Sequence, residues 1–106
     1  MKSTRRVGVV LILSLVLLLV ASTQAQEKWV VCRVTYAGPG WGDIFIRLKD
    51  ANDLPSFTER WFRPLRGQER EMLATALAAI ANGNWVLCYV DVDFEYSTIQ
   101  ALYMMK

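Results

Sequence analysis

The feature that most constrains this chain is an alanine-rich segment that leads directly into an apolar strand. Residues 69–81, EREMLATALAAIA, have the apolar spacing of a helix, and Asn82-Gly83 marks its end. The strand WVLCYVDVD follows at residues 85–93 and contains Cys88. The other cysteine, Cys32, lies in a similar strand near the opposite end of the chain. This placement allows the two ends of one small domain to be connected.

The first 25 residues have the pattern of a secretory signal. Lys2, Arg5 and Arg6 form a basic head, and the apolar run over residues 7–20 leads to small residues at 23–25. That run is shorter than the roughly 20 residues that span a bilayer, which disfavours the alternative of a retained signal anchor. We therefore expect a secreted or periplasmic protein that consists of residues 26–106 and keeps no membrane span.

Loss of this segment changes the charge and the size of the chain. Nine basic and ten acidic residues remain, so the net charge is about −1 and no polyanionic partner is indicated. A single domain of this size has a marginal core. A disulfide between Cys32 and Cys88 is the expected bond in an exported protein, and in the chain-entropy account it stabilises the fold by about 4 kcal/mol. Two buried free thiols are the competing interpretation.

Five strands and one helix are predicted from the periodicity of the chain. The strands are expected at residues 28–36, 44–49, 57–62, 85–91 and 97–105, with the glycine-rich GPGWG at 38–42 as a break between the first two.

The same periodicity assigns faces. In the first strand, the residues expected on one face are Val30, Cys32, Val34 and Tyr36. In the helix, the residues expected to face the core are Met72, Leu73, Ala76, Leu77 and Ile80.

The order strand, strand, strand, helix, strand, strand predicts a mainly β fold with one helix. It is the order of an OB-fold, a five-stranded Greek-key barrel with one helix. The first and fourth strands of such a barrel pair, which would make Cys32 and Cys88 cross-strand neighbours at the separation that a disulfide requires. The alternative is an open α+β sheet with the helix on one face, which does not require adjacent cysteines.

With these features and the passage MLATALAAIANGNWVLCYVDV at residues 72–92, the chain resembles the B subunits of bacterial AB5 toxins. It is most similar to the subtilase cytotoxin B subunit type. The resemblance is one of pattern over residues 30–105, and this chain is shorter than the members of that family. It implies an OB-fold subunit in a five-membered ring, a pentamer, that binds host glycans and accompanies a catalytic A subunit.

Neither a catalytic site nor a cofactor or metal site is predicted. The chain has no histidine, and its two cysteines are expected to be bonded, so the usual bases, nucleophiles and zinc ligands are missing. Asp91, Asp93 and Glu95 alternate and could hold calcium, but the pattern of a calcium loop is incomplete. A solvated strand edge is the favoured interpretation of these carboxylates.

Aromatic residues are the strongest candidates for a binding role. Sugars pack their C–H faces on aromatic rings, and OB-folds use the loop between the first two strands to bind ligands. Trp41 lies in that loop, and the candidate ligand-binding residues are Tyr36, Trp41 and Asp43. The alternative for Trp41 is a ring folded back over the end of the barrel. Trp85 and Tyr89 share the strand face opposite Cys88 and are candidates for a subunit interface.

A group of arginines lies between the third strand and the helix. Its members are Arg60, Arg63, Arg66 and Arg70, interleaved with Trp61 and Phe62. OB-folds bind single-stranded nucleic acid with such residues, but export and the slightly negative charge argue against nucleic acid. Surface ion pairs with Glu59, Glu69 and Glu71 are one alternative. The resemblance favours another, in which these arginines bridge subunits of a ring.

The sequence as a whole predicts an exported binding module without enzymatic activity. The expected ligand is a glycan or glycoprotein, and the resemblance implies a ring oligomer. The alternative is a structural or accessory protein of the periplasm whose aromatic residues contact another protein and bind no sugar.

Overall fold

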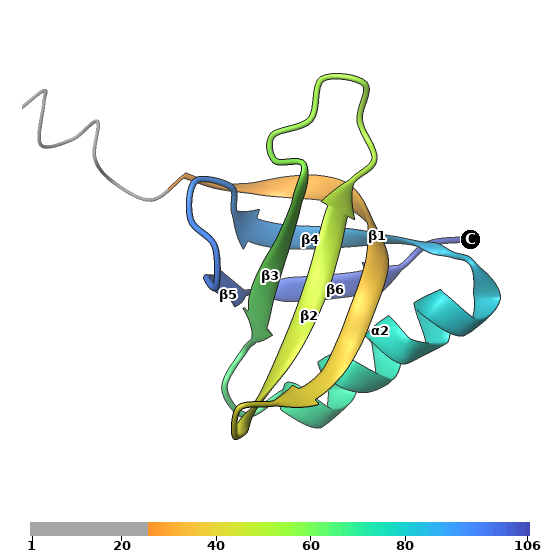
Figure 1. Cartoon of the computed structure of the whole chain (residues 1–106). Helices are drawn as coiled ribbons and strands as arrows, with labels where there is room; N and C mark the ends of the chain where they lie inside the picture. Colours follow the sequence, from red (N-terminus) through yellow and green to blue (C-terminus); the bar gives the residue numbers. More distant parts are fainter. Residues whose placement is uncertain (1–25) are drawn as a thin grey trace, which may run out of the picture.

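A computed structural model describes residues 26–106, which form six strands and one helix (Figure 1). The predicted signal segment, residues 1–25, lies outside the described residues. The strands are β1 (Glu27–Gly40), β2 (Asp43–Asp50), β3 (Glu59–Pro64), β4 (Trp85–Asp91), β5 (Thr98–Ile99) and β6 (Ala101–Met104), and helix α2 (Glu69–Asn82) lies between β3 and β4. The mainly β fold with one helix is confirmed.

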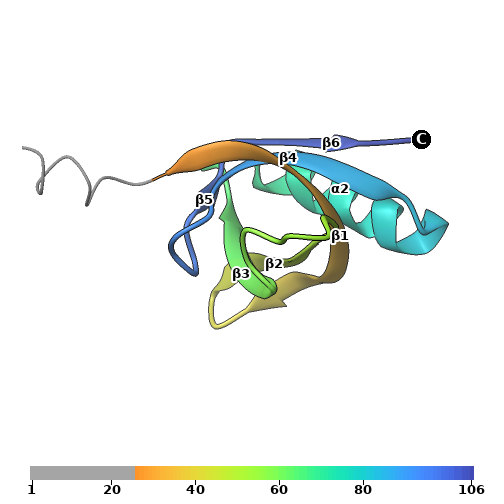
Figure 2. The ribbon, with the colours of Figure 1, turned by 90° about the horizontal axis from the view of Figure 1, so that it is seen from above.

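The strands form one open mixed sheet in the order β5-β3-β2-β1-β4-β6. All neighbours are antiparallel except β3 and β5, which are parallel. Figure 2 shows that β1 curves, with β4 and β6 on one side of the bend and β2 and β3 on the other. The predicted fifth strand over residues 97–105 is interrupted at Gln100, and its two parts stand at the opposite ends of the sheet order.

Helix α2 has the predicted bounds but not the predicted core face. Gly83 ends the helix in the left-handed region, with φ of 66°, which glycine adopts without steric strain. Met72, Ala76 and Ala79 are buried, whereas Leu77 and Ile80 are exposed. The prediction was wrong for these last two because the small alanines, rather than the larger side chains, face the sheet and allow a close approach.

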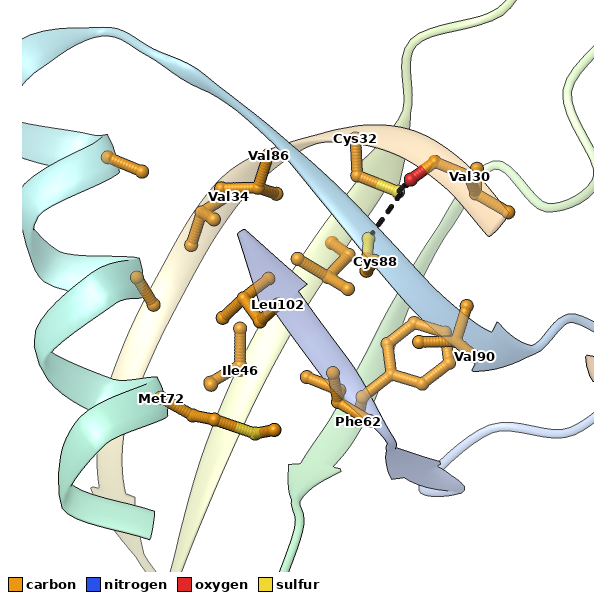
Figure 3. Packing of buried hydrophobic residues seen from close by; sticks show 14 of the residues in the cluster. Val30, Cys32, Val34, Ile46, Phe62, Met72, Val86, Cys88, Val90 and Leu102 are labelled. Carbon is orange, nitrogen blue, oxygen red and sulfur yellow. Dashed lines mark hydrogen bonds between the residues drawn. The ribbon is translucent and has the colours of Figure 1, made fainter. Parts of the chain in front are cut away.

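Buried side chains from both halves of the sheet and from α2 meet in one core (Figure 3). Phe62 is fully buried and packs edge-on against Phe57, with 5.3 Å between the ring centroids. On β1, Val30, Cys32 and Val34 point inward as predicted, but Tyr36 does not. The register of β1 against β2 shifts between Val34 and Tyr36, and this β-bulge turns Tyr36 to the outer face.

The predicted break at GPGWG is shorter in the structure than expected. Strand β1 continues through Gly38 and Pro39 to Gly40, which pairs with Asp43. Pro39 is tolerated because β1 pairs with β4 only as far as Arg33, so this end of β1 has no ladder partner on its second side.

The predicted disulfide is absent, because Cys32 and Cys88 are both free, buried thiols. The first and fourth strands do pair, but Cys32 stands opposite Val86 and Cys88 stands opposite Val30. The cysteines are therefore diagonal neighbours. In a regular ladder the α-carbons of such neighbours lie about 7–8 Å apart, beyond the range in which most disulfides form.

Candidate functional site

A two-residue turn between β1 and β2 holds the most exposed aromatic side chain of the described chain. Trp41 and Gly42 are the central residues of this turn, and both have positive φ, 56° and 79°. Positive φ at both positions is typical of a type I′ hairpin, in which asparagine and glycine are the favoured residues. Trp41 is 100% exposed. Its ring is thus not folded back over the end of the sheet.

The bulge in β1 brings Tyr36 into a row with two residues of the neighbouring strands. Tyr36 pairs with Arg47 of β2, which pairs with Trp61 of β3. The Arg47 guanidinium lies over both rings, 5.9 Å from the Tyr36 centroid and 5.5 Å from the Trp61 centroid. The two rings are 6.0 Å apart. A cation shared by two rings favours a defined orientation of both.

Two further aromatic residues extend this row. Phe45 packs edge-on against Trp61 and against Tyr96, at centroid distances of 6.4 Å and 5.8 Å. Tyr96 belongs to the segment that follows β4, and its N–H donates to the carbonyl oxygen of Trp61 at 2.7 Å. This bond holds the segment against β3. Tyr96 has a φ of 63°, which is rare for an aromatic residue.

These residues surround a depression of about 390 Å³, which we name the aromatic pocket. Its lining consists of Tyr36, Ala37, Gly38, Pro39, Gly40, Trp41, Phe45, Trp61 and Tyr96. Trp41 and Tyr96 are the two non-glycine residues with positive φ among the described residues, and both belong to this lining. Backbone strain of this kind, about 1–3 kcal/mol per residue, concentrates at binding sites.

The pocket offers ring faces, and two arginines that are not part of its lining lie over those rings. Arg47 is partly exposed, and its Nε lies 3.5 Å from Oε1 of Glu59. Arg63 stacks on Phe45, with its guanidinium carbon 5.8 Å from the ring centroid. Flat apolar surfaces with hydrogen-bond donors beside them suit a ligand that has both C–H faces and hydroxyl groups.

Two of the three predicted ligand-binding residues belong to this pocket. Tyr36 and Trp41 line it. Asp43 lies at the start of β2 and is not part of the lining; its carboxylate accepts a hydrogen bond from the N–H of Ile44 at 2.8 Å. Asp43 is therefore at the base of the turn that presents Trp41, rather than at the ring faces.

The four predicted interface arginines do not form one group. Arg60 stacks on Phe57 and donates a hydrogen bond to the carbonyl of Val92, whereas Arg63 stacks on Phe45. Arg66, in the segment before α2, and Arg70, in the first turn of α2, are both exposed. None of the four forms an ion pair within residues 26–106, and Glu59 pairs with Arg47 instead.

A second group of rings, each exposed or half-buried, lies over β1, β4 and β6, and we name it the outer aromatic surface. The Trp29 centroid is 5.1 Å from that of Tyr89 and 6.0 Å from that of Tyr103. Farther along the same face, Arg33 lies over the ring of Trp85 at 5.9 Å. The two predicted interface aromatics, Trp85 and Tyr89, therefore share the face opposite the buried Cys88.

Residues 26–106 hold no group of three or more potential metal ligands. Of the alternating carboxylates Asp91, Asp93 and Glu95, only the last two are exposed. Asp91 is buried and accepts a hydrogen bond from the N–H of Asp93 at 3.0 Å, while Asp93 and Glu95 are exposed. In this part of the chain no helix has the length and apolar character of a membrane span.

Phe45, Trp61 and Tyr96 line the pocket and Arg47 lies over two of its rings, but all four are absent from the predicted ligand-binding set. A signal for two of them exists in the sequence, because Phe45 and Arg47 alternate with the inward residues of β2. Tyr96 has no such signal. It lies in an irregular segment, and only the pairing of β3 with β5 brings that segment to Trp61.

Comparison of the chain with protein-family models, with curated proteins and with solved structures gives no match.

Proposed function

We propose that this chain is an exported binding module that holds a carbohydrate in the aromatic pocket. The observation that carries the proposal is the placement of Trp41 and Tyr96, whose unfavourable backbone conformations occur at the same depression. A fully exposed tryptophan in a turn position that favours asparagine adds nothing to the core. A role in binding accounts for such a residue at this position.

The fold that we propose for this module is an OB-fold barrel. Two pairings support it: β5 lies parallel to β3, and β6 lies antiparallel to β4. One residue, Gln100, separates β5 from β6, so a single segment joins the two outer strands of the sheet. OB-folds bind ligands on the face of the second and third strands and at the loop between the first two. The aromatic pocket occupies the corresponding position here.

Carbohydrate is the ligand class that the pocket chemistry favours. Rings of Tyr36, Trp41 and Trp61 offer flat faces to the C–H groups of a sugar, and the Arg47 guanidinium offers donors to its hydroxyls. The slightly negative charge of residues 26–106 disfavours a polyanionic ligand.

The test is a glycan array followed by calorimetric titration of the best-bound glycan. Trp41→Ala is expected to weaken binding at least about tenfold, which is about 1.4 kcal/mol, without loss of stability, because the side chain is fully exposed. Trp85→Ala is the matched control, since it removes an exposed tryptophan from the outer aromatic surface. Equal affinity of the Trp41→Ala variant and the unaltered chain would remove this pocket as the sugar site.

The second candidate function is that of an accessory domain that binds another protein. It is favoured by the outer aromatic surface, where Trp29 is 52% and Tyr103 is 58% exposed. Aromatic residues are enriched in protein interfaces. For an accessory domain we expect no bound glycan on the array and a stable complex that is lost in a Trp29→Ala variant.

A further inference from the structure

The outer aromatic surface belongs to a layer of the sheet that no other element of residues 26–106 covers. Figure 2 shows the layer formed by β1, β4 and β6 almost edge-on, with α2, β2 and β3 all on its inner side. On the outer side, Trp29 is 52%, Trp85 is 43% and Tyr103 is 58% exposed. The outer aromatic surface is therefore accessible to a binding partner.

Strand pairing arranges nine outward positions of this layer in three rows. The rows are Trp29, Tyr89 and Ala101; Val31, Leu87 and Tyr103; and Arg33, Trp85 and Met105. Arg33 is the one charged residue among the nine. The exposed face of an antiparallel sheet ordinarily carries polar side chains. A continuous apolar face of this kind marks a contact surface.

The outer aromatic surface is too small to hold a protein stably by itself. Two strand spacings by four residue steps measure about 10 Å by about 13 Å. With its side chains the face still falls well below the ~800 Å², from about 20–30 residues, that each partner buries in a stable protein interface. Beyond Arg33 the layer does not continue, because β1 leaves β4 there and bends away (Figure 2). The same limit applies to a second copy of this chain.

The chemistry of the face fits the interface of a phospholipid bilayer. Tryptophan and tyrosine are enriched at that interface because each ring has an apolar body and a polar tip. Val31, Leu87 and Met105 add apolar side chains between the rings. Arg33 forms no ion pair within residues 26–106, and its long side chain can reach a lipid phosphate. A sugar site needs more polar groups around its rings, whereas the nine positions include no asparagine, glutamine, serine, threonine or acid.

We propose that the outer aromatic surface rests on a phospholipid bilayer, with its rings at the level of the headgroups. A bilayer is a plane, and this layer lies flat at one end of the molecule, so the contact requires no other element. The aromatic pocket lies over β2 and β3, beyond the bend of β1, and stays free. The inference thus goes beyond sugar binding and does not depend on it.

The experiment is co-sedimentation of the purified exported chain with vesicles of phosphatidylcholine, alone and mixed with phosphatidylglycerol. We expect binding to both. The anionic lipid should strengthen binding by about fivefold at most, because one basic residue stands on the face.

Two variants of exposed tryptophans test which face makes the contact. Trp29→Ala should weaken vesicle binding at least about fivefold, the loss expected from one half-exposed large side chain. Trp41→Ala is the matched control, because it removes the ring from the aromatic pocket, and it should bind vesicles within about twofold of the unaltered chain. Tyr103→Ala, at the opposite margin of the face, replaces Trp29→Ala if that variant loses stability.

Vesicles with brominated acyl chains locate the contact directly, because bromine quenches tryptophan fluorescence only at short range. We expect part of the fluorescence to be quenched. Replacement of both Trp29 and Trp85 by phenylalanine should remove most of this quenching, whereas Trp41→Phe should leave it unchanged.

Three results would overturn the proposal. They are the absence of sedimentation at millimolar lipid, equal vesicle binding of Trp29→Ala and the unaltered chain, and quenching that Trp41→Phe alone removes. The first result, together with a partner protein that Trp29→Ala no longer binds, would assign the face to a protein. The second would assign vesicle binding to another part of the chain.

Discussion

Cys88 donates a hydrogen bond from its thiol to the carbonyl oxygen of Val30, the residue directly opposite it on β1, at 3.3 Å (Figure 3). The Cys32 thiol lies 3.9 Å from the same oxygen. Both cysteines are completely buried. We therefore expect both thiols to resist alkylation by iodoacetamide in the folded chain and both to react in denaturant, as measured by mass. Native labelling at either cysteine would contradict this packing.

The buried thiols also predict a dependence of stability on pH. The hydrogen bond with Cys88 and, as the second cause, burial raise the pKa of the Cys32 thiol far above its ordinary value of 9.0. Above pH ~9 the Cys32 thiol loses its proton in the unfolded chain but keeps it in the folded chain. The free energy of unfolding therefore falls as pH rises. The free energy of unfolding should fall by about 1.4 kcal/mol per pH unit from this group above pH ~9.

Urea unfolding between pH 7 and pH 10.5 measures this slope. The Cys32→Ala variant is the control, because it lacks the titrating thiol and should show a correspondingly smaller slope. An identical slope in the two proteins would show that Cys32 does not keep its proton in the folded chain.

Replacement of Trp41 by asparagine is expected to stabilise the fold and to weaken ligand binding. Trp41→Asn creates the Asn-Gly pair that a type I′ turn favours and removes a strained, fully exposed ring. We expect a gain of about 1 kcal/mol, which raises the melting temperature of a domain of this size by about 4–8 °C.

Calorimetry measures this gain, and Gly42→Ala is the contrasting variant. Gly42→Ala places a side chain at a φ of 79° and should lower the stability of the fold by about 1 kcal/mol. If Trp41→Asn melted at or below the temperature of the unaltered chain, the strain argument for the site would be wrong.

Asp50 anchors the loop between β2 and β3. Its buried carboxylate accepts hydrogen bonds from the N–H of Asn52 at 2.9 Å, from the side-chain amide of Asn52 at 2.6 Å and from the N–H of Ser56 at 2.6 Å. Asp50→Ala is expected to destabilise the fold by about 2 kcal/mol, because three donors lose a charged acceptor that is itself buried. Hydrogen exchange should become faster at Asn52 and Ser56. Asp53→Ala, at an exposed position of the same loop, should change stability by less than about 0.5 kcal/mol.

Arg47 is expected to position the rings of the aromatic pocket. Arg47→Met keeps much of the side-chain volume but removes the guanidinium that lies over Tyr36 and Trp61. We expect a loss of about 0.5–1 kcal/mol in ligand binding, which is about two- to fivefold in affinity, and a change in tryptophan fluorescence. Lys49→Met, two residues farther on the same strand, is the control for the loss of positive charge. Equal effects of the two variants would assign the loss to charge alone.

Local features of the sequence determined the elements of this fold. The spacing of apolar residues predicts α2 and Gly83 predicts its end, because helix periodicity and a left-handed cap depend on neighbouring residues alone. Alternation places Val30, Cys32 and Val34 inward and sets Phe45 and Arg47 on the outer face of β2. The glycine-rich loop also pointed to Trp41 of the aromatic pocket, whereas alternation placed Tyr36 on the wrong face.

The tertiary structure decided how these elements meet. The bulge after Val34 turns Tyr36 outward, and the register between β1 and β4 separates the two cysteines by two positions. Register depends on the packing of whole strands against a shared core, and no local pattern specifies it. For the same reason Tyr96, which is remote in sequence from Trp41, completes the aromatic pocket only when the segment after β4 is held against β3.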